Sequence, residues 1–234
     1  MIKRIALSGI TGKMGRFLLD SFVSHPDYEV VAGISEKEDL SGRIPIYSDI
    51  KTMYKKQNFD IFVDFTIAAF SVDACIFMLE KKIPIVVGTT GFSKDDLDLL
   101  KSKAENSKTG GIIAPNFSLG IVFLYKCLKM ATQYFREFAV YEYHHYTKHD
   151  NPSGTAHYLA DAIGSTANIN VTDIHGFRLP GVLATHTIVM SDETQKIEFV
   201  HQSNNRHSFE EGILLAINKV SNLDGLVYGL EQLF

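Results

Sequence analysis

The sequence predicts an α/β protein with a doubly wound parallel sheet and a second, smaller α+β domain. Three observations support this prediction. Short apolar runs alternate with helical patterns through the first half of the chain, and a glycine-rich loop follows the first run. After Asn116 the pattern changes to a long helix and then to strands. Strand–helix alternation is typical of parallel sheets with helices on both faces.

Five runs in the first half are rich in Val, Ile and Phe and show little polar alternation, as expected of strands buried on both faces. They are Lys3–Ser8, Glu29–Ile34, Asp60–Thr66, Pro84–Gly88 and Gly111–Ala114. Helical patterns lie between them at Lys13–Ser24, Ile50–Gln57, Ala69–Lys81 and Lys94–Asn106. Ser93, followed by Asp95 and Asp96, predicts an N-cap with acidic residues in the first turn.

The second half predicts helices and strands in a different order. The expected elements are helices at Leu119–Phe135 and Pro152–Ala167, a strand in REFAVYEYHHY, strands at Val171–Arg178, Leu183–Ser191 and Lys196–Gln202, and a last helix at Ser208–Val220. Asp192-Glu193-Thr194 is expected to turn the last two strands into a hairpin. We therefore expect residues 1–118, completed by 208–234, to form a dinucleotide-type domain, and residues 119–207 to form the second domain.

Composition narrows the class of protein. The 234 residues are 45% hydrophobic and 21% charged, and the net charge of -4 gives no general attraction to nucleic acid or to an anionic membrane. No apolar run approaches the roughly 20 residues that span a bilayer. The first apolar stretch is broken by Ser8 and Gly9, which makes it a poor signal peptide. Cys75 and Cys127 lie in apolar helical patterns and are expected to be buried thiols. A cytoplasmic protein is expected, with no nucleic acid or membrane partner.

The loop ALSGITGKMGRFLL places Gly9, Gly12 and Gly15 between a strand and a helix. Glycines there permit a tight turn and close backbone approach, and the helix N-terminus offers free N–H groups to a pyrophosphate. The spacing is G-x-x-G-x-x-G, with Thr11 where the commonest fingerprint has its middle glycine, so a turn that binds nothing is the alternative. A Rossmann-like cofactor site is favoured, and its expected residues are Gly9, Ile10, Thr11, Gly12, Lys13 and Met14.

The end of the next strand strengthens the prediction of a cofactor site. Glu36 lies 21 positions after Gly15, where an acidic side chain hydrogen-bonds a ribose diol. Lys37 follows directly and offers a cation to a 2′-phosphate. Glu36 favours NADH and Lys37 leaves NADPH open, so both cofactors remain candidates.

Two further loops follow strands and are expected at the same carboxyl edge of the sheet, where such sheets bind ligands. One is VVGTTGF and the other is IIAPNFSLG. Small and hydroxyl residues in them let the backbone approach a flat ring or a phosphate. The cofactor residues expected here are Gly88, Thr89, Thr90, Ala114, Pro115, Asn116 and Phe117.

The stretch EYHHYTKHDNPSGTA holds two adjacent histidines, a lysine and a helix-opening Ser-Gly-Thr. His144, His145 and His149 lack the i, i+4 spacing of a zinc protease, and no cysteine or carboxylate cluster completes a ligand set, so no metal is expected. No G-x-S-x-G elbow surrounds Ser153, which disfavours a nucleophile. Acid–base chemistry and anion binding fit better, because an imidazole titrates near neutrality and a helix N-terminus attracts anions. A solvated loop before a capped helix is the alternative.

Taken together, GITGKMGR, VDFT, VGTTGF, APNFSLG, EYHHYTKHDNPSGTA and RLPG resemble the dihydrodipicolinate reductase family, and SNNRHSF fits it as well. The resemblance covers nearly the whole chain. Three features depart from the family pattern: Asn151 stands where alanine is frequent, Ile67-Ala68 stands where a proline is common, and the chain is shorter than many members.

The resemblance implies an NADH- or NADPH-dependent reduction of a cyclic imine dicarboxylate in lysine and diaminopimelate biosynthesis. The substrate would be 4-hydroxy-tetrahydrodipicolinate, reduced via dihydrodipicolinate to tetrahydrodipicolinate. His144 would be the acid–base, with Lys148 as second proton donor and charge partner. Asp150 would orient Lys148 or the loop rather than react. The substrate carboxylates would be bound by His145, Lys148, Ser153, Gly154 and Thr155. The family also implies a homotetramer, with the second domain binding substrate and forming the oligomer.

Two other functions account for part of the sequence. Another two-domain nicotinamide dehydrogenase, acting on a semialdehyde or a sugar, explains the first half but not the string HHxxK followed by PSGTA. A dinucleotide-sensing protein without catalysis would need no proton donor. Oxidation of the cofactor in the presence of the pathway intermediate distinguishes all three.

Overall fold

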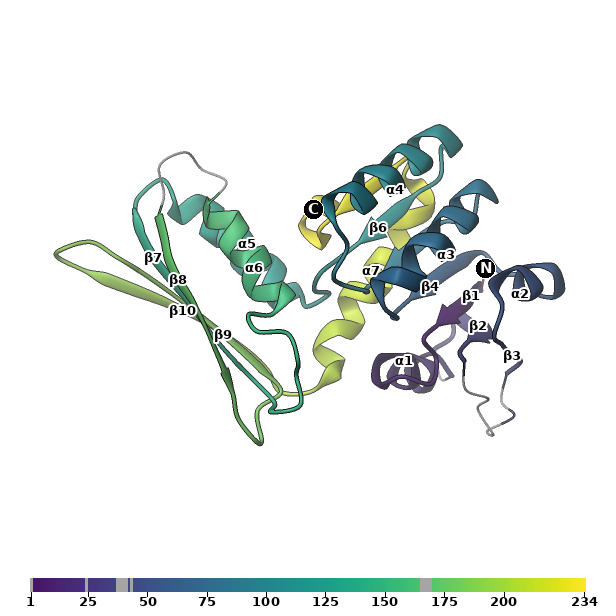
Figure 1. Ribbon diagram of the computed structural model, residues 1–234, viewed down its shortest axis with the longest axis horizontal. Helices are drawn as coiled ribbons and strands as arrows, with labels where there is room; N and C mark the ends of the chain where they lie inside the picture. The colour runs from purple at the N-terminus through teal and green to yellow at the C-terminus, as the bar shows by residue number, and fades with distance from the viewer. Residues whose placement is uncertain (1, 24, 37–41, 43, 165–169) are drawn as a thin grey trace. The chain divides into compact units, whose positions relative to one another are not determined.

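The computed structural model describes residues 2–23, 25–36, 42, 44–164 and 170–234. The chain divides into two compact units (Figure 1). Unit 1 contains Met1–Ala114 and Gly212–Leu233, and unit 2 contains Pro115–Glu211 together with Phe234.

Unit 1 is built on a seven-stranded sheet whose order is β11-β6-β5-β4-β1-β2-β3. Every pair is parallel. Chain order reverses between β1 and β4, which is the topological switch point where open α/β sheets bind ligands. This sheet confirms the predicted doubly wound fold class. The strands are β1 (Lys3–Ser8), β2 (Tyr28–Ile34), β3 (Ile46–Tyr47), β4 (Ile61–Asp64), β5 (Ile85–Val87), β6 (Gly111–Ile113) and β11 (Leu226–Tyr228).

Helices lie on both sides of this sheet, with α3 and α4 on one side and α1 and α7 on the other (Figure 1). They are α1 (Lys13–Val23), α2 (Ile50–Lys56), α3 (Ala68–Glu80), α4 (Lys94–Ser107) and α7 (Glu210–Lys219). Every residue of β4, β5 and β6 is buried, which explains why these strands are apolar apart from Asp64 at the end of β4. Ser93 caps α4 as predicted, in a reciprocal capping box with Asp96.

Unit 2 contains a mixed four-stranded sheet of order β10-β9-β7-β8. Its strands are β7 (Glu137–His144), β8 (Asn170–Arg178), β9 (Ala184–Ser191) and β10 (Lys196–Ser203), and its helices are α5 (Leu119–Ala131) and α6 (Gly154–Gly164). Strand β7 runs parallel to β8 and antiparallel to β9. Alternate residues of β7 are buried, because one face of the sheet packs against α5 and α6.

Several element boundaries differ from the sequence prediction. The helix expected to reach Phe135 ends at Ala131, and α6 begins at Gly154 rather than Pro152. The last helix is flanked by two 3₁₀ turns, Arg206–Phe209 and Val220–Asn222. The predicted hairpin forms between β9 and β10, where the Asp192 carboxylate accepts hydrogen bonds from the turn. No helix in the described part of the chain is long and apolar enough to cross a bilayer.

Candidate active site

The glycine loop between β1 and α1 has the close packing that its sequence suggests. Gly9 has a φ of +75°, and a Cβ there would lie 2.3 Å from the carbonyl oxygen of Phe65. A Cβ at Gly15 would lie 2.3 Å from the carbonyl oxygen of Gly9. The N–H of Gly12 donates to that same carbonyl over 2.9 Å, which closes the turn. Side chains at Gly9 and Gly15 would therefore destroy the loop.

A cavity of about 390 Å³ opens beside this loop. It is lined by Gly9, Thr11, Gly12, Ile34, Ser35, Glu36, Thr66, Ile67 and Phe70. The predicted ribose ligand Glu36 thus shares a cavity with three predicted loop residues. The Thr11 and Ser35 hydroxyls lie 2.7 Å apart and link the loop to the end of β2.

Three loop residues from the prediction contribute no side chain to the cavity lining. Ile10 is fully buried beneath Gly33, Lys13 is exposed, and Met14 is half-buried. Ile10 therefore takes part in the turn through its backbone and not through its side chain. Lys37 lies outside the described residues.

The loops after β4 and β5 are tied together by a buried carboxylate. Asp64 is fully buried and accepts hydrogen bonds from the hydroxyls of Thr66, Ser71 and Thr89. At Gly88 a Cβ would lie 2.1 Å from the ring of Phe65. Gly88 and Thr89 are therefore packed inside this edge of the sheet, against Phe65 and Asp64 respectively, whereas Thr90 is exposed.

The loop after β6 leads from one unit to the other. Ala114 is the last residue of this segment in unit 1, and Pro115, Asn116 and Phe117 belong to unit 2. The Asn116 side-chain amide donates to the Thr155 hydroxyl over 3.0 Å, so a predicted cofactor residue contacts a predicted substrate residue. Ala114 and Phe117 are buried.

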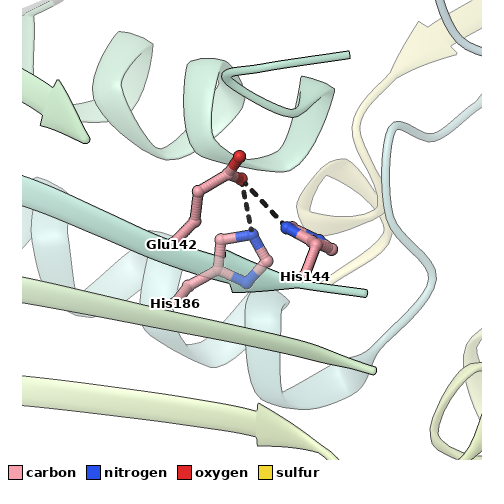
Figure 2. A group of neighbouring side chains, drawn as sticks. All are labelled: Glu142, His144 and His186. Carbon is pink, nitrogen blue, oxygen red and sulfur yellow. Dashed lines mark ion pairs between the residues drawn. The ribbon is translucent and has the colours of Figure 1, made fainter. Parts of the chain in front are cut away.

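Strand β7 ends at the acid–base string, where Glu142 and two histidines meet (Figure 2). The carboxylate atom Oε2 of Glu142 lies 3.4 Å from His144 Nδ1 and 3.6 Å from His186 Nε2. All three residues are buried. Glu142 also accepts hydrogen bonds from the N–H and the hydroxyl of Ser153 and, over 2.9 Å, from Arg178 Nη2.

Burial and charge shift the ionisation of this cluster. Burial would raise the pKa of Glu142, but hydrogen bonds from its neighbours and the charge of His144 lower it to about 2. Burial lowers the pKa of His144 to about 4, against the opposing charge of Glu142. Burial therefore favours the neutral form of the His144 ring at pH 7.

The other predicted substrate residues lie in the turn after β7 and at the start of α6. Lys148 Nζ forms an ion pair with Asp150 Oδ1 over 2.7 Å. His145 is half-buried, with its Nδ1 2.8 Å from the Thr147 hydroxyl. Gly154 and Thr155 form the first turn of α6, whereas Ser153 uses both of its donors on Glu142.

Both units match models of one protein family. Residues 3–117 match the family model described as dihydrodipicolinate reductase, N-terminus, and residues 120–234 match dihydrodipicolinate reductase, C-terminus. The chain belongs to the dihydrodipicolinate reductase family. The resemblance inferred from the sequence is confirmed.

Relatives match over the full length of the chain. The 4-hydroxy-tetrahydrodipicolinate reductase of Oceanobacillus iheyensis is 33% identical, and the alignment covers 100% of both chains. That of Listeria innocua is 32% identical, covering 98% of this chain and 99% of the relative. The dipicolinate-bound dihydrodipicolinate reductase of Paenisporosarcina sp. TG-14 has a TM-score of 0.85 at 30% identity over 100% of both chains. GenD2 of gentamicin A biosynthesis, in complex with NAD, shares the fold alone, with a TM-score of 0.70 at 11% identity over 94% of this chain and 87% of GenD2.

Three residues around His144 were not assigned a role from the sequence: Glu142, Arg178 and His186. Glu142 and Arg178 lie in the quoted motifs EYHHY and RLPG, so a signal was present but had no chemical interpretation. His186 has no local signal; it reaches the cluster only because β9 pairs with β7 and places it opposite Glu142. Of the three histidines weighed as metal ligands from the sequence, only His144 lies beside Glu142, together with His186.

Proposed function

We propose that this reductase converts 4-hydroxy-tetrahydrodipicolinate, via dihydrodipicolinate, to tetrahydrodipicolinate in lysine and diaminopimelate biosynthesis. The observation that carries this proposal is the match of both units to one reductase family over the full chain. The buried imidazole of His144, held beside Glu142 at the end of β7, supplies the chemical group that the reaction requires. The protein works in the cytoplasm.

The glycine loop and Glu36 would hold a nicotinamide dinucleotide. The fit is supported by Gly9 and Gly15, where any side chain would collide with backbone, and by the position of Glu36 in the adjoining cavity. Loop N–H groups at the start of α1 would bind the pyrophosphate, and the Glu36 carboxylate would accept from a ribose hydroxyl. The nicotinamide supplies the hydride.

The loops at the ends of β5 and β6 would complete the cofactor site. Gly88, Thr89, Thr90 and Ala114 come from unit 1, and Pro115, Asn116 and Phe117 follow in the chain. Their backbone groups and small side chains suit a flat ring. NADH and NADPH both remain open, because Glu36 favours the first and Lys37 the second.

The substrate is a ring with two carboxylates, and unit 2 offers groups of matching charge. Gly154 and Thr155 form the first turn of α6, where the helix dipole favours an anion. Lys148 adds a cation and His145 a further donor. Ser153 contributes indirectly, since it is engaged with Glu142.

His144 would deliver the proton that accompanies the hydride. Burial disfavours the imidazolium and favours the neutral ring. A bound dicarboxylate brings two negative charges close to the ring and raises its pKa, so substrate binding and protonation of His144 are coupled. Lys148 is the second proton donor, and Asp150 orients its ammonium.

The protein would assemble as a homotetramer through unit 2. The sheet face turned away from α5 and α6 carries aromatic pairs, Tyr141 stacked on His175 and Tyr143 stacked on Phe177. Val200 on β10 is 62% exposed. An apolar face of this kind is suited to contact with a second copy of the chain.

A reductase assay tests the proposal. Loss of NADH or NADPH absorbance is followed after the pathway intermediate is supplied, with wild type and His144→Ala compared. We expect turnover by wild type and a loss of about 10²–10⁴-fold in kcat in the variant, with a smaller change in KM, because general acid–base catalysis acts in the transition state. No cofactor oxidation by wild type would contradict the proposed activity. A variant with wild-type kcat would contradict the role of His144.

A further inference from the structure

One buried carboxylate, Glu142, joins three segments that the proposed function uses separately. It lies two residues before His144 on β7. It accepts from Ser153, directly before α6, and from Arg178 at the end of β8. The motifs EYHHY, PSGT and RLPG therefore converge on a single side chain, although Arg178 lies 36 positions from Glu142 in the sequence.

The hydrogen bonds around Glu142 account for nearly all of its accepting capacity. Oε1 accepts from the N–H of Ser153 and from Arg178 Nη2, each over 2.9 Å. Oε2 accepts from the Ser153 hydroxyl and faces the two imidazoles. Every neighbour is a donor or a cation, which keeps a fully buried carboxylate ionised.

The same arrangement weighs against a metal ion at this cluster. Glu142, His144 and His186 offer ligand atoms within 4.8 Å of one another. However, an ion there would share Oε2 with the Ser153 hydroxyl and would lie close to the Arg178 guanidinium. The cluster is better explained as a hydrogen-bonded support for an imidazole.

We propose that Glu142 is a positioning residue for His144. Its carboxylate accepts from Nδ1–H of the ring, which leaves Nε2 as the atom that faces the substrate, and it stabilises the imidazolium when the ring takes up a proton. This inference rests on the proposed function in one respect, namely that His144 is the proton donor.

The polar atom Nδ1 of His144 supports this assignment. It is buried and makes no hydrogen bond of good geometry. The carboxylate of Glu142, 3.4 Å away, is the acceptor placed to take its proton. Contacts of catalytic groups are often long before substrate binds and shorten in the complex.

The charges facing His144 make Glu142 the decisive neighbour. The other groups whose charge bears on the ring are His186 on β9, Lys148 in the turn and Arg178 on β8, and all of these disfavour an imidazolium. His201 on β10 lies opposite His186, one strand further away. Glu142 alone among them is an anion, so its neutralisation leaves the ring without a counter-charge from these neighbours.

The variant Glu142→Gln tests the proposal with almost no change in shape. The amide oxygen keeps the Oε1 hydrogen bonds, while the amide N–H replaces Oε2 and points a donor at Nδ1. The ring must then carry its proton on Nε2, and the imidazolium becomes unfavourable. We expect kcat to fall by about 10²-fold or more, with substrate KM changed far less. The loss should also grow with rising pH, because His144 protonates less readily.

Glu137→Gln is the matched control, since Glu137 is an exposed carboxylate on the same strand. It should retain wild-type kcat and the wild-type pH profile. A Glu142→Gln enzyme that is folded and keeps the wild-type kcat and pH profile would overturn the proposal.

A spectroscopic readout separates this inference from the proposed function. In protein with isotope-labelled histidine, ring nitrogen shifts report which nitrogen is protonated, and His144→Gln identifies the His144 signals. We expect Nδ1–H for His144 in wild type and Nε2–H in Glu142→Gln. A wild-type ring protonated on Nε2 would overturn the positioning role, even where Glu142→Gln does not fold. A protein with the expected tautomer but no reductase activity would instead contradict the proposed function alone.

Discussion

At the scale of single residues, two buried histidines of unit 2, His144 and His201, should make the stability of the fold depend on pH. Burial lowers the pKa of His144 to about 4, and burial together with the charge of His186 lowers the pKa of His201. The unfolded chain, with histidine pKa values near 6.5, therefore binds more protons than the folded chain between these values. Stability from the neutral rings is complete above pH 6.5 and is lost as pH falls toward 4.

We accordingly expect the Tm of the wild type to decrease steadily from pH 7 to pH 4. The low pKa of Glu142, about 2, adds a further loss below its usual value of 4.5, because protonation breaks its hydrogen bonds. Thermal unfolding measured across this range, in wild type and His201→Gln, gives the test. The variant should show a weaker pH dependence, and a wild-type Tm independent of pH would contradict the argument.

At the scale of helices and strands, most of the fold can be predicted from local patterns. Strands such as β4 and β5 are recognisable because burial on both faces makes nearly every residue in them apolar. In contrast, β3 and β11 contain only two and three residues and are strands because of their parallel neighbours β2 and β6. The glycine loop could also be recognised from the sequence, because a backbone that leaves no room for a side chain requires glycine at Gly9 and Gly15.

The cluster around Glu142 shows where local patterns are insufficient. The pairing of His186 with Glu142 depends on the register between β7 and β9, which no window of sequence contains. The pKa of His144 depends on the burial of its side chain, which the sequence around it does not reveal. Such properties require the assembled sheet.

Glu36 and Lys37, which follow strand β2 in the sequence, should set the preference between NADH and NADPH. Glu36→Ala should weaken NADH more than NADPH, because only NADH has a free 2′-hydroxyl for the carboxylate. Lys37→Ala should weaken NADPH more, since it removes a cation that would face the 2′-phosphate. KM values for both cofactors, measured in each variant, give the result. An unchanged ratio in both variants would mean that the ribose end of the site lies elsewhere.

At the scale of the whole molecule, the uncovered face of the unit 2 sheet should carry the contacts between subunits. Light scattering should give a mass four times that of the 26.2 kDa chain. Val200→Glu should shift the mass toward smaller species, because a carboxylate would be buried in an apolar contact. Lys51→Glu, in unit 1, serves as the control. A monomeric wild type at micromolar concentration would contradict the tetramer.

Transfer of deuterium from the nicotinamide to the product tests the central claim most directly. A cofactor that carries deuterium at both hydrogen positions of the reactive ring carbon is supplied with the pathway intermediate in ordinary water, and the product is analysed by mass spectrometry. The proposed reaction predicts one deuterium atom in each product molecule, with the accompanying proton drawn from solvent through His144. Product formed by the enzyme without deuterium from the cofactor would contradict the account.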